Sequence, residues 1–183
     1  SAPLVWTSYR DEAGRLVVEL PNTRPAPGVG EWSGPEGLLA RLAVELFDLI
    51  HSVDSLKLAR ELDKQAARIG KRQAVLIQVN TGGEASKSGV AVEEALALVA
   101  AAVRLEHLEV RGLMTIPPFF DAPERARPFF RQLRELRDRY HAAPGASPAV
   151  GELSMGMTGD FEAAIAEGAT LVRVGTAIFG ARP

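Results

Sequence analysis

The segment LSMGMTGDFEAAIAEGATLVRVGTAIFG, residues 153–180, contains residue types suited to holding an anion. Thr158 offers a hydroxyl, and Gly159 beside it allows a ligand to approach the backbone closely. A short helix expected in DFEAAIAEG would direct its first N–H groups, and the positive end of its dipole, toward the same place. Thr158 is also a plausible N-cap of that helix, and capping alone could explain it. A second turn, in VRVGT, follows an apolar strand, so the two turns together predict an anion-binding site.

The elements that must position these turns are visible from residue 47 onward. Short runs rich in Val, Ile and Leu are FDLIHSV (47–53), QAVLIQVN (73–80), LEVRGLMTI (108–116), GELSM (151–155) and TLVRVGTAIFG (170–180). Stretches with helical periodicity separate them: SLKLARELDKQAARIG, VEEALALVAAAVRL, APERARPFFRQLRELRDRYHA and DFEAAIAEG. This alternation is typical of a parallel α/β sheet. The nearly continuous apolar runs indicate strands covered on both faces.

Residues 1–46 follow a different pattern. LVWTSYRDEAGRLVVEL (4–20) predicts two strands around a Gly-containing turn, which is a hairpin. PNTRPAPGVGEWSGPEG (21–37) is rich in Pro and Gly and predicts a loop, and the helix LLARLAVEL follows it. We therefore expect one domain overall, with a divergent N-terminal segment (1–46) and a regular α/β part (47–183).

The composition of the chain excludes several classes of function. The chain has 183 residues, of which 46% are hydrophobic, and this is enough for one compact domain. Its net charge of −2 gives no basic field for nucleic acid or an anionic membrane. There is no cysteine, which excludes disulfides and thiolate metal sites, and the spacing of His51, His107 and His141 indicates no metal site. Without a membrane-spanning apolar run or a signal pattern at its start, the sequence is expected to be soluble and cytoplasmic.

Four stretches, HSVDSLKLAREL, IQVNTGGEASKSGV, RGLMTIPP and LSMGMTGDFEAAIAEGATLVRVGTAIFG, closely resemble the pyridoxal phosphate homeostasis proteins, the YggS/PROSC-like family. The resemblance covers about residues 47–181. It implies the TIM-type (β/α)8 barrel of the alanine racemase N-terminal domain, incomplete or altered over its first three strands. The five runs would then be barrel strands four to eight. Such barrels place their sites at the C-terminal ends of the strands, often with phosphate bound after strands seven and eight.

The resemblance implies pyridoxal 5′-phosphate (PLP) as the ligand. Thr158, Gly175 and Thr176 would hold the phosphate with the backbone at Gly159, and Arg173 would face the pyridine nitrogen. A guanidinium stays protonated and cannot accept a hydrogen bond, so the ring nitrogen beside it stays unprotonated. The ring is then a poorer electron sink, which disfavours strong carbanion chemistry.

Three candidates have structural alternatives. Asn80 ends the run LIQVN and could contact the cofactor, but asparagine also commonly ends strands as a turn residue. Met114 lies near the expected mouth of the barrel, where simple packing is at least as good an interpretation. Arg173 could be a strand-end arginine paired with a carboxylate.

The lysine that holds the PLP aldehyde in this family ends the first strand, and no equivalent is found here. The lysines of the chain are Lys57, Lys64, Lys71 and Lys87, and none precedes residue 57. The nearest local match, LVWTSY (4–9), would put Tyr9 at the lysine position. Three explanations for the missing lysine are open: a natural variant with an altered barrel front, a damaged or mispredicted gene start, or an engineered chain. We expect the hairpin to pack against the open barrel edge and keep the protein monomeric, because an uncovered edge would cause self-association.

We therefore predict a PLP-binding protein of the homeostasis type, non-catalytic, with PLP held non-covalently. One alternative is a degenerate barrel that binds no PLP, or that binds any phosphate-bearing metabolite. A racemase-like PLP enzyme is less favoured, because it needs a lysine base and usually a second acid or base that the sequence does not show.

Overall fold

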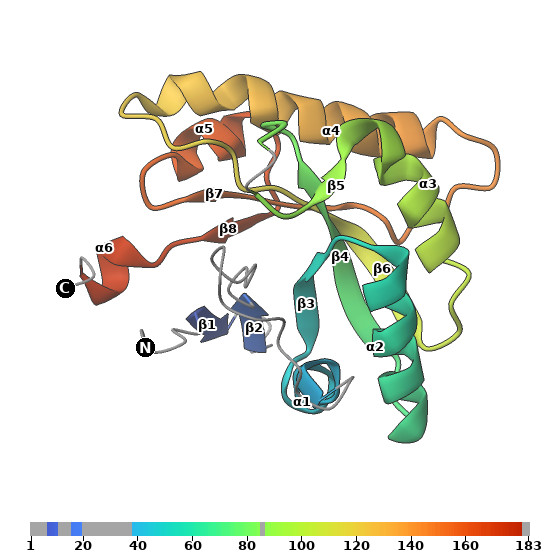
Figure 1. Cartoon of the computed structure of the whole chain (residues 1–183). Helices are drawn as coiled ribbons and strands as arrows, with labels where there is room; N and C mark the ends of the chain where they lie inside the picture. The colour runs from blue at the N-terminus through green and yellow to red at the C-terminus, as the bar shows by residue number, and fades with distance from the viewer. Residues whose placement is uncertain (1–6, 11–15, 20–37, 85–86, 181–183) are drawn as a thin grey trace.

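The protein is described here by a computed structural model, which covers residues 7–10, 16–19, 38–84 and 87–180. Its strands form one sheet in the order β1, β2, β3, β4, β6, β7, β8, with β5 paired to β4 (Figure 1). The strands are β1 (Thr7–Arg10), β2 (Leu16–Glu19), β3 (Leu49–Val53), β4 (Gln73–Asn80), β5 (Val90–Ala91), β6 (Leu108–Met114), β7 (Glu152–Met157) and β8 (Leu171–Arg173). β1 and β2 are antiparallel, and the pairings from β2–β3 onward are parallel. The hairpin thus extends a parallel half-barrel beyond β3.

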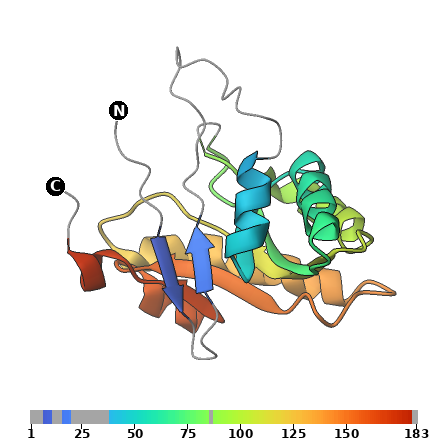
Figure 2. The ribbon, with the colours of Figure 1, turned by 90° about the horizontal axis from the view of Figure 1, so that it is seen from below.

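Helices cover the outer face of this sheet. The helical elements are α1 (Leu38–Leu46), α2 (Leu56–Arg68), α3 (Val92–Ala102), the 3₁₀ turn η1 (Pro123–Ala126), α4 (Arg127–His141), α5 (Phe161–Ala166) and α6 (Thr176–Phe179). The last of these, α6, has no buried residue and extends beyond the end of β8 (Figure 1). α2 and α3 contact β4, and α4 and α5 contact β7. Seen from below, α1, α2 and α3 gather at one end, and the hairpin lies in this view between α1 and α6 (Figure 2).

The two faces of the sheet are packed differently, as β4 shows. Val75, Ile77 and Val79 belong to the large core between the sheet and the helices. Ala74 and Leu76 point the other way, because side chains alternate along a strand. On that inner face they form a small apolar cluster with Leu49 of β3 and Met114 of β6, against which Ile116 and Leu171 pack. An apolar cluster therefore lines the inner face of the sheet on β3, β4 and β6.

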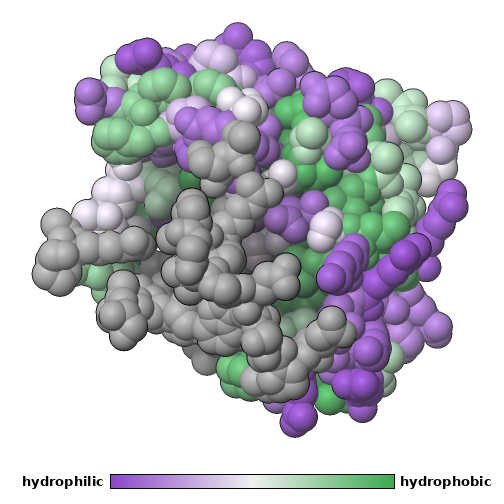
Figure 3. All heavy atoms as spheres, in the orientation of Figure 1, coloured by the Kyte–Doolittle hydropathy of each residue, from purple (hydrophilic) through white to green (hydrophobic). Residues whose placement is uncertain are grey.

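α2 shows how the sequence produces one of the covering helices. The Ser55 hydroxyl caps it by accepting a hydrogen bond from the Leu58 N–H at 3.3 Å. Ala59 and Leu62 are buried on its inner side, while hydrophilic surface gathers over the helix at the lower right of Figure 3. After Arg68 the chain turns at Gly70, whose φ of 64° is the left-handed conformation that ends many helices. Ser55 is thus the N-cap of α2.

Other expected elements are present with small changes. All five runs after residue 47 contain a strand, and the four intervening helices form. The last run is the exception, because its strand ends at Arg173 and residues 176–179 form α6. There the Ile178 and Phe179 N–H groups both bond to the Gly175 carbonyl at 2.9 Å, a local bonding pattern that apolar composition does not reveal. The two-residue β5 was not expected either.

An ion cluster holds α5 against α4. Glu167, at the C-terminal end of α5, is 4% exposed. Its carboxylate lies 2.9 Å from Arg131 Nη2 and from Arg134 Nη1, and 3.7 Å from Arg127 Nε. The hydrogen bond from Arg131, with the charges of the three arginines, lowers the pKa of Glu167, although its burial opposes the shift. Because α5 directly follows the loop after β7, the cluster also fixes the far end of that loop.

Candidate functional site

Polar side chains replace the apolar inner cluster at the C-terminal ends of the strands. A chain of hydrogen bonds crosses the sheet there, from His51 on β3 through Ser154 on β7 to Arg173 on β8, and from Arg173 to the Thr115 carbonyl just after β6. We call these four residues the polar belt. Barrels of this kind bind ligands at the C-terminal ends of their strands, and the polar belt lies toward that end.

Arg173 is the charged member of the belt and is 4% exposed. Its Nη1 donates to Ser154 Oγ at 2.7 Å, and its Nη2 donates to the Thr115 carbonyl oxygen at 3.0 Å. Burying a guanidinium costs several kcal/mol unless hydrogen bonds replace its hydration. A buried arginine held in one orientation at the ligand end of a barrel therefore suits recognition better than packing.

His51 is fully buried and sits at the far end of the belt. Its Nδ1 lies 3.0 Å from Ser154 Oγ. Burial, together with the positive charge of Arg173, lowers the pKa of His51 to about 3. The imidazole is therefore neutral at physiological pH, and Arg173 is the charged residue of the belt.

Sequence reasoning missed His51 and Ser154. From the sequence, His51 is a candidate only for metal binding, and Ser154 is one of several serines with no distinguishing motif. A usable pattern was present, since each interrupts an apolar run, LIHSV and ELSMGM, at a position buried in the sheet. A polar residue at such a position needs a partner, but the sequence does not show which one.

A second hydrogen-bond chain braces the middle of the sheet. Thr115 Oγ1 donates to the Val79 carbonyl oxygen at 2.8 Å, and the Thr81 hydroxyl lies 2.8 Å from Thr115 Oγ1. Because Thr115 uses its only hydroxyl proton on Val79, Thr81 must be the donor to Thr115. The backbone carbonyl of Thr115 that receives Arg173 is thereby held in place from β4.

The predicted phosphate residues come from two loops that the fold brings together. Thr158, after β7, accepts a hydrogen bond at Oγ1 from the backbone N–H of Ala177 in α6, at 3.3 Å. Gly175 occupies the N-cap position of α6, and Thr176 is its first residue. Gly159 is exposed, and a Cβ built on it meets no atom within 4 Å. These four residues thus line two adjacent turns at the ligand end of β7 and β8.

The loop after β7 is shaped by Gly156 and Asp160. Gly156 has a φ of 92°, and a Cβ there would lie 2.6 Å from the Cβ of Ala164. Asp160 Oδ1 accepts a hydrogen bond from the Met157 N–H at 2.6 Å and occupies the N-cap position of α5. Capping of this helix by Thr158 is therefore wrong, and its hydroxyl instead joins the two loops.

Asn80 and Met114 do not belong to the polar belt. The Asn80 amide nitrogen donates to the Glu84 carbonyl oxygen at 2.9 Å and lies 3.5 Å from that of Lys87, so it braces the loop after β4. Met114, 2% exposed, packs in the inner apolar cluster. A cofactor contact by either residue stays a prediction.

The lysines are engaged in several different places. Lys71 Nζ donates to the carbonyl oxygens of Val44 and Phe47, at 2.7 and 2.6 Å, and so caps the end of α1. Lys87, after β4, lies 2.7 Å from the Glu84 carboxylate and donates to the Pro117 carbonyl oxygen at 3.1 Å. Lys64 pairs with Glu61 on α2.

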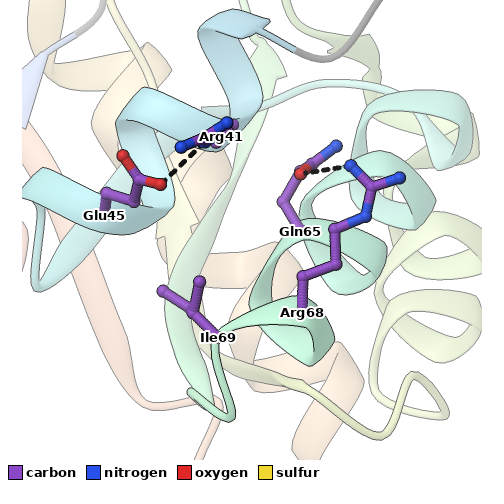
Figure 4. Close-up of a pocket in the computed structure, with 5 residues that line it drawn as sticks. All are labelled: Arg41, Glu45, Gln65, Arg68 and Ile69. Carbon is purple, nitrogen blue, oxygen red and sulfur yellow. Dashed lines mark hydrogen bonds and ion pairs between the residues drawn. The ribbon is translucent and has the colours of Figure 1, made fainter.

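A cavity of about 210 Å³ lies away from the polar belt, between α1 and α2 (Figure 4). Arg41 and Glu45, one turn apart on α1, pair at 2.7 Å on one side of it, and Arg68 of α2 donates to Gln65 at 3.1 Å on the other. Its polar groups thus bond to each other, which is typical of a groove between helices.

Within the ranges described, no group of His, Asp or Glu side chains is placed to hold a metal ion. The helices described there include none with the length and apolar character needed to cross a membrane.

An α/β half-barrel with a buried polar belt and two adjacent glycine turns at the C-terminal ends of its strands belongs to the class that binds small ligands at this end. Residues 19–183 match the alanine racemase N-terminal domain family. A pyridoxal phosphate homeostasis protein of Aquifex aeolicus is 50% identical over 134 residues, which are 73% of this chain and 58% of that protein. One from Escherichia coli is 44% identical over 146 residues, covering 78% of this chain and 60% of that protein. The chain belongs to the alanine racemase N-terminal domain family, and it is similar to these pyridoxal phosphate homeostasis proteins.

Solved structures agree with this assignment. The structure of PipY of Synechococcus elongatus with PLP bound has a TM-score of 0.70 and 36% identity, covering 83% of this chain and 68% of that one. An alanine racemase of Clostridium difficile has a TM-score of 0.62 at 18% identity, which shows the shared fold alone. The chain spans about three fifths of the length of the curated relatives it matches, 58% and 60% of the two named above.

Proposed function

We propose that this protein binds PLP at the C-terminal ends of its strands as a non-catalytic member of the homeostasis family. The observation that carries the proposal is the buried Arg173, fixed by Ser154 and the Thr115 carbonyl at the same end as the two glycine turns. The relative from Synechococcus elongatus, described with PLP bound, supports it.

In this proposal each end of the ligand has its own residues. Thr158 and Thr176 would donate their hydroxyl protons to the phosphate, and Gly159 and Gly175 would let it approach the backbone. The Thr158 hydroxyl fits this role because it accepts from Ala177 and so keeps its own proton for an anion. Arg173 would face the pyridine nitrogen.

When bound, PLP supplies an electrophilic aldehyde and an electron-withdrawing ring. Arg173 would limit the second property, because a guanidinium donates to the ring nitrogen and cannot protonate it at neutral pH. With no lysine before residue 57, we propose that binding is non-covalent and reversible. These two features suit holding and release of the cofactor better than catalysis.

We further propose that the protein is a cytoplasmic monomer, as its lack of cysteine and its sheet favour. The backbone of β2 pairs with β3, so the hairpin covers the edge that the first barrel units would otherwise cover. Light scattering after size-exclusion chromatography tests the monomer, and a stable dimer would contradict it.

Calorimetric titration with PLP, pyridoxal and inorganic phosphate tests the function. We expect PLP to bind more tightly than either of the others, because both ends of the ligand are recognised. No heat with PLP would indicate a barrel without this ligand, and equal affinity for PLP and phosphate would indicate a general phosphate binder. Trapping a lysine adduct with borohydride would contradict non-covalent binding.

A further inference from the structure

We propose that His51 is a positioning residue that, through Ser154, fixes the guanidinium of Arg173 for its ligand. The role of Arg173 toward a ligand rests on the proposed function. The arrangement of the three side chains does not, because it is present in the protein alone.

The donor and acceptor roles in this chain follow from the chemistry of its groups. Ser154 is fully buried, and its hydroxyl lies within hydrogen-bond distance of His51 Nδ1 and Arg173 Nη1. Arginine has donors and no acceptor, so the hydroxyl proton of Ser154 cannot go to Arg173. It must go to His51 Nδ1, since a buried hydroxyl proton without an acceptor is costly. His51 Nδ1 is therefore unprotonated, and the proton of the neutral ring is on Nε2.

This tautomer determines the orientation of the Ser154 oxygen. With its proton held toward His51, Ser154 directs a lone pair toward Arg173 Nη1. The Thr115 carbonyl receives Nη2 at the same time, so the guanidinium plane is held at two points. His51 thereby acts on Arg173 without touching it through a hydrogen bond of its own.

Packing alone does not explain a histidine at this position. Leu49, Ile50 and Val53 of the same strand are buried and apolar, and His51 is as buried as they are. Among the described residues, its Nε2 has no hydrogen-bond partner, which is an unfavourable feature for a purely structural side chain. An acceptor for Ser154 is what the imidazole provides that leucine or valine would not.

Nitrogen NMR of the imidazole in the intact protein, without added ligand, tests the tautomer directly. We expect an unprotonated Nδ1 and a protonated Nε2 at neutral pH. A proton on Nδ1, or a charged ring, would overturn the inference. In the same sample the side-chain N–H signals of Arg173 should be those of a fixed guanidinium, and they should broaden in His51→Leu.

Two variants separate positioning from packing. His51→Leu keeps similar bulk but removes the acceptor, whereas His51→Asn places an amide oxygen near the position of Nδ1. We expect His51→Leu to bind PLP about tenfold more weakly, with inorganic phosphate binding unchanged, and His51→Asn to restore most of the PLP affinity. Equal losses in both variants, or an equal loss for phosphate, would overturn the positioning role.

Ser154→Ala supplies the coupling test. If His51 acts through Ser154, the double variant with His51→Leu should bind PLP no more weakly than the weaker single variant. Additive losses would overturn the inference. If the wild-type protein does not bind PLP at all, the proposed function is wrong. The positioning of Arg173 by His51 is still tested in that case, because the NMR measurements report the tautomer of His51 and the order of Arg173.

Discussion

Thr158 Oγ1 accepts a hydrogen bond from the backbone N–H of Ala177 at 3.3 Å, and this contact ties the loop after β7 to α6. Because the hydroxyl is the acceptor here, its proton is available to an anion. We expect Thr158→Val to weaken binding of PLP and of inorganic phosphate alike by about tenfold, and Thr158→Ser to retain both. Calorimetric titration measures this, and unchanged affinity in Thr158→Val would place the phosphate elsewhere.

Arg173 should act on one end of the ligand only. Arg173→Gln is expected to reduce PLP affinity by about tenfold or more while leaving phosphate affinity unchanged, because the guanidinium is engaged with Ser154 and the Thr115 carbonyl whereas the proposed phosphate residues lie in the turns after β7 and β8. It should also lower the free energy of unfolding by about 1–3 kcal/mol, since Ser154 and the Thr115 carbonyl lose a charged donor. Arg41→Gln, on exposed α1, is the matched control. Loss of phosphate binding in Arg173→Gln would assign it to the phosphate instead.

The buried His51 should make stability depend on pH. Its pKa is lowered from 6.5 to about 3 in the folded protein, so between these values the unfolded chain binds more protons. The free energy of unfolding should therefore rise with pH in this window, by up to about 1.4 kcal/mol per pH unit, and be lost as the pH falls. Urea unfolding at a series of pH values checks this. His51→Leu should remove this part of the pH dependence. If the free energy of unfolding of His51→Leu varied with pH as in the wild-type protein, the prediction would be contradicted.

Glu167 should contribute to stability through its three arginines on α4. Glu167→Gln is expected to lower the free energy of unfolding by about 1–3 kcal/mol, because the arginines lose a buried charged acceptor. Since the folded pKa of Glu167 is lowered, its contribution is fully present above the ordinary carboxyl pKa and is lost as the pH falls from there through the lowered folded pKa. The exposed Glu162 on the same helix supplies the control variant, Glu162→Gln, and equal effects of the two would contradict the ion cluster.

Gly156 should tolerate no side chain. Gly156→Ala places a Cβ 2.6 Å from the Cβ of Ala164 and 3.0 Å from the Cα of Phe161, at a φ of 92°. We expect a loss of unfolding free energy of about 1–3 kcal/mol, from steric overlap and from left-handed backbone strain. Gly151→Ala is the control, because its Cβ meets no atom within 4 Å. Thermal melting of both variants measures this loss of stability, and equal melting midpoints would contradict the prediction.

Much of the fold could be predicted because its determinants are local. The run QAVLIQVN is β4 from its first residue to its last, and LLARLAVEL is α1, since apolar runs and helical periodicity act over a few neighbouring residues. The boundary of β8 could not be predicted in the same way. Val174 to Phe179 is apolar enough for a strand, and only the hydrogen bonds to the Gly175 carbonyl turn it into α6.

Only part of the candidate site could likewise be predicted from the sequence. Residue types pointed to Thr158 and Gly159, with the turn in VRVGT, as an anion site, because hydroxyls and glycines suit an anion. The family resemblance added the roles of Gly175, Thr176 and Arg173. The partners were decided by tertiary structure. His51 and Ser154 are 103 residues apart in sequence, and they meet because the sheet curls into a half-barrel, which brings the inner faces of β3 and β7 together although β4 and β6 lie between them in the strand order. Burial at that edge then makes His51 neutral and Arg173 a fixed donor, and burial is a property of the packed molecule that the order of residues does not display.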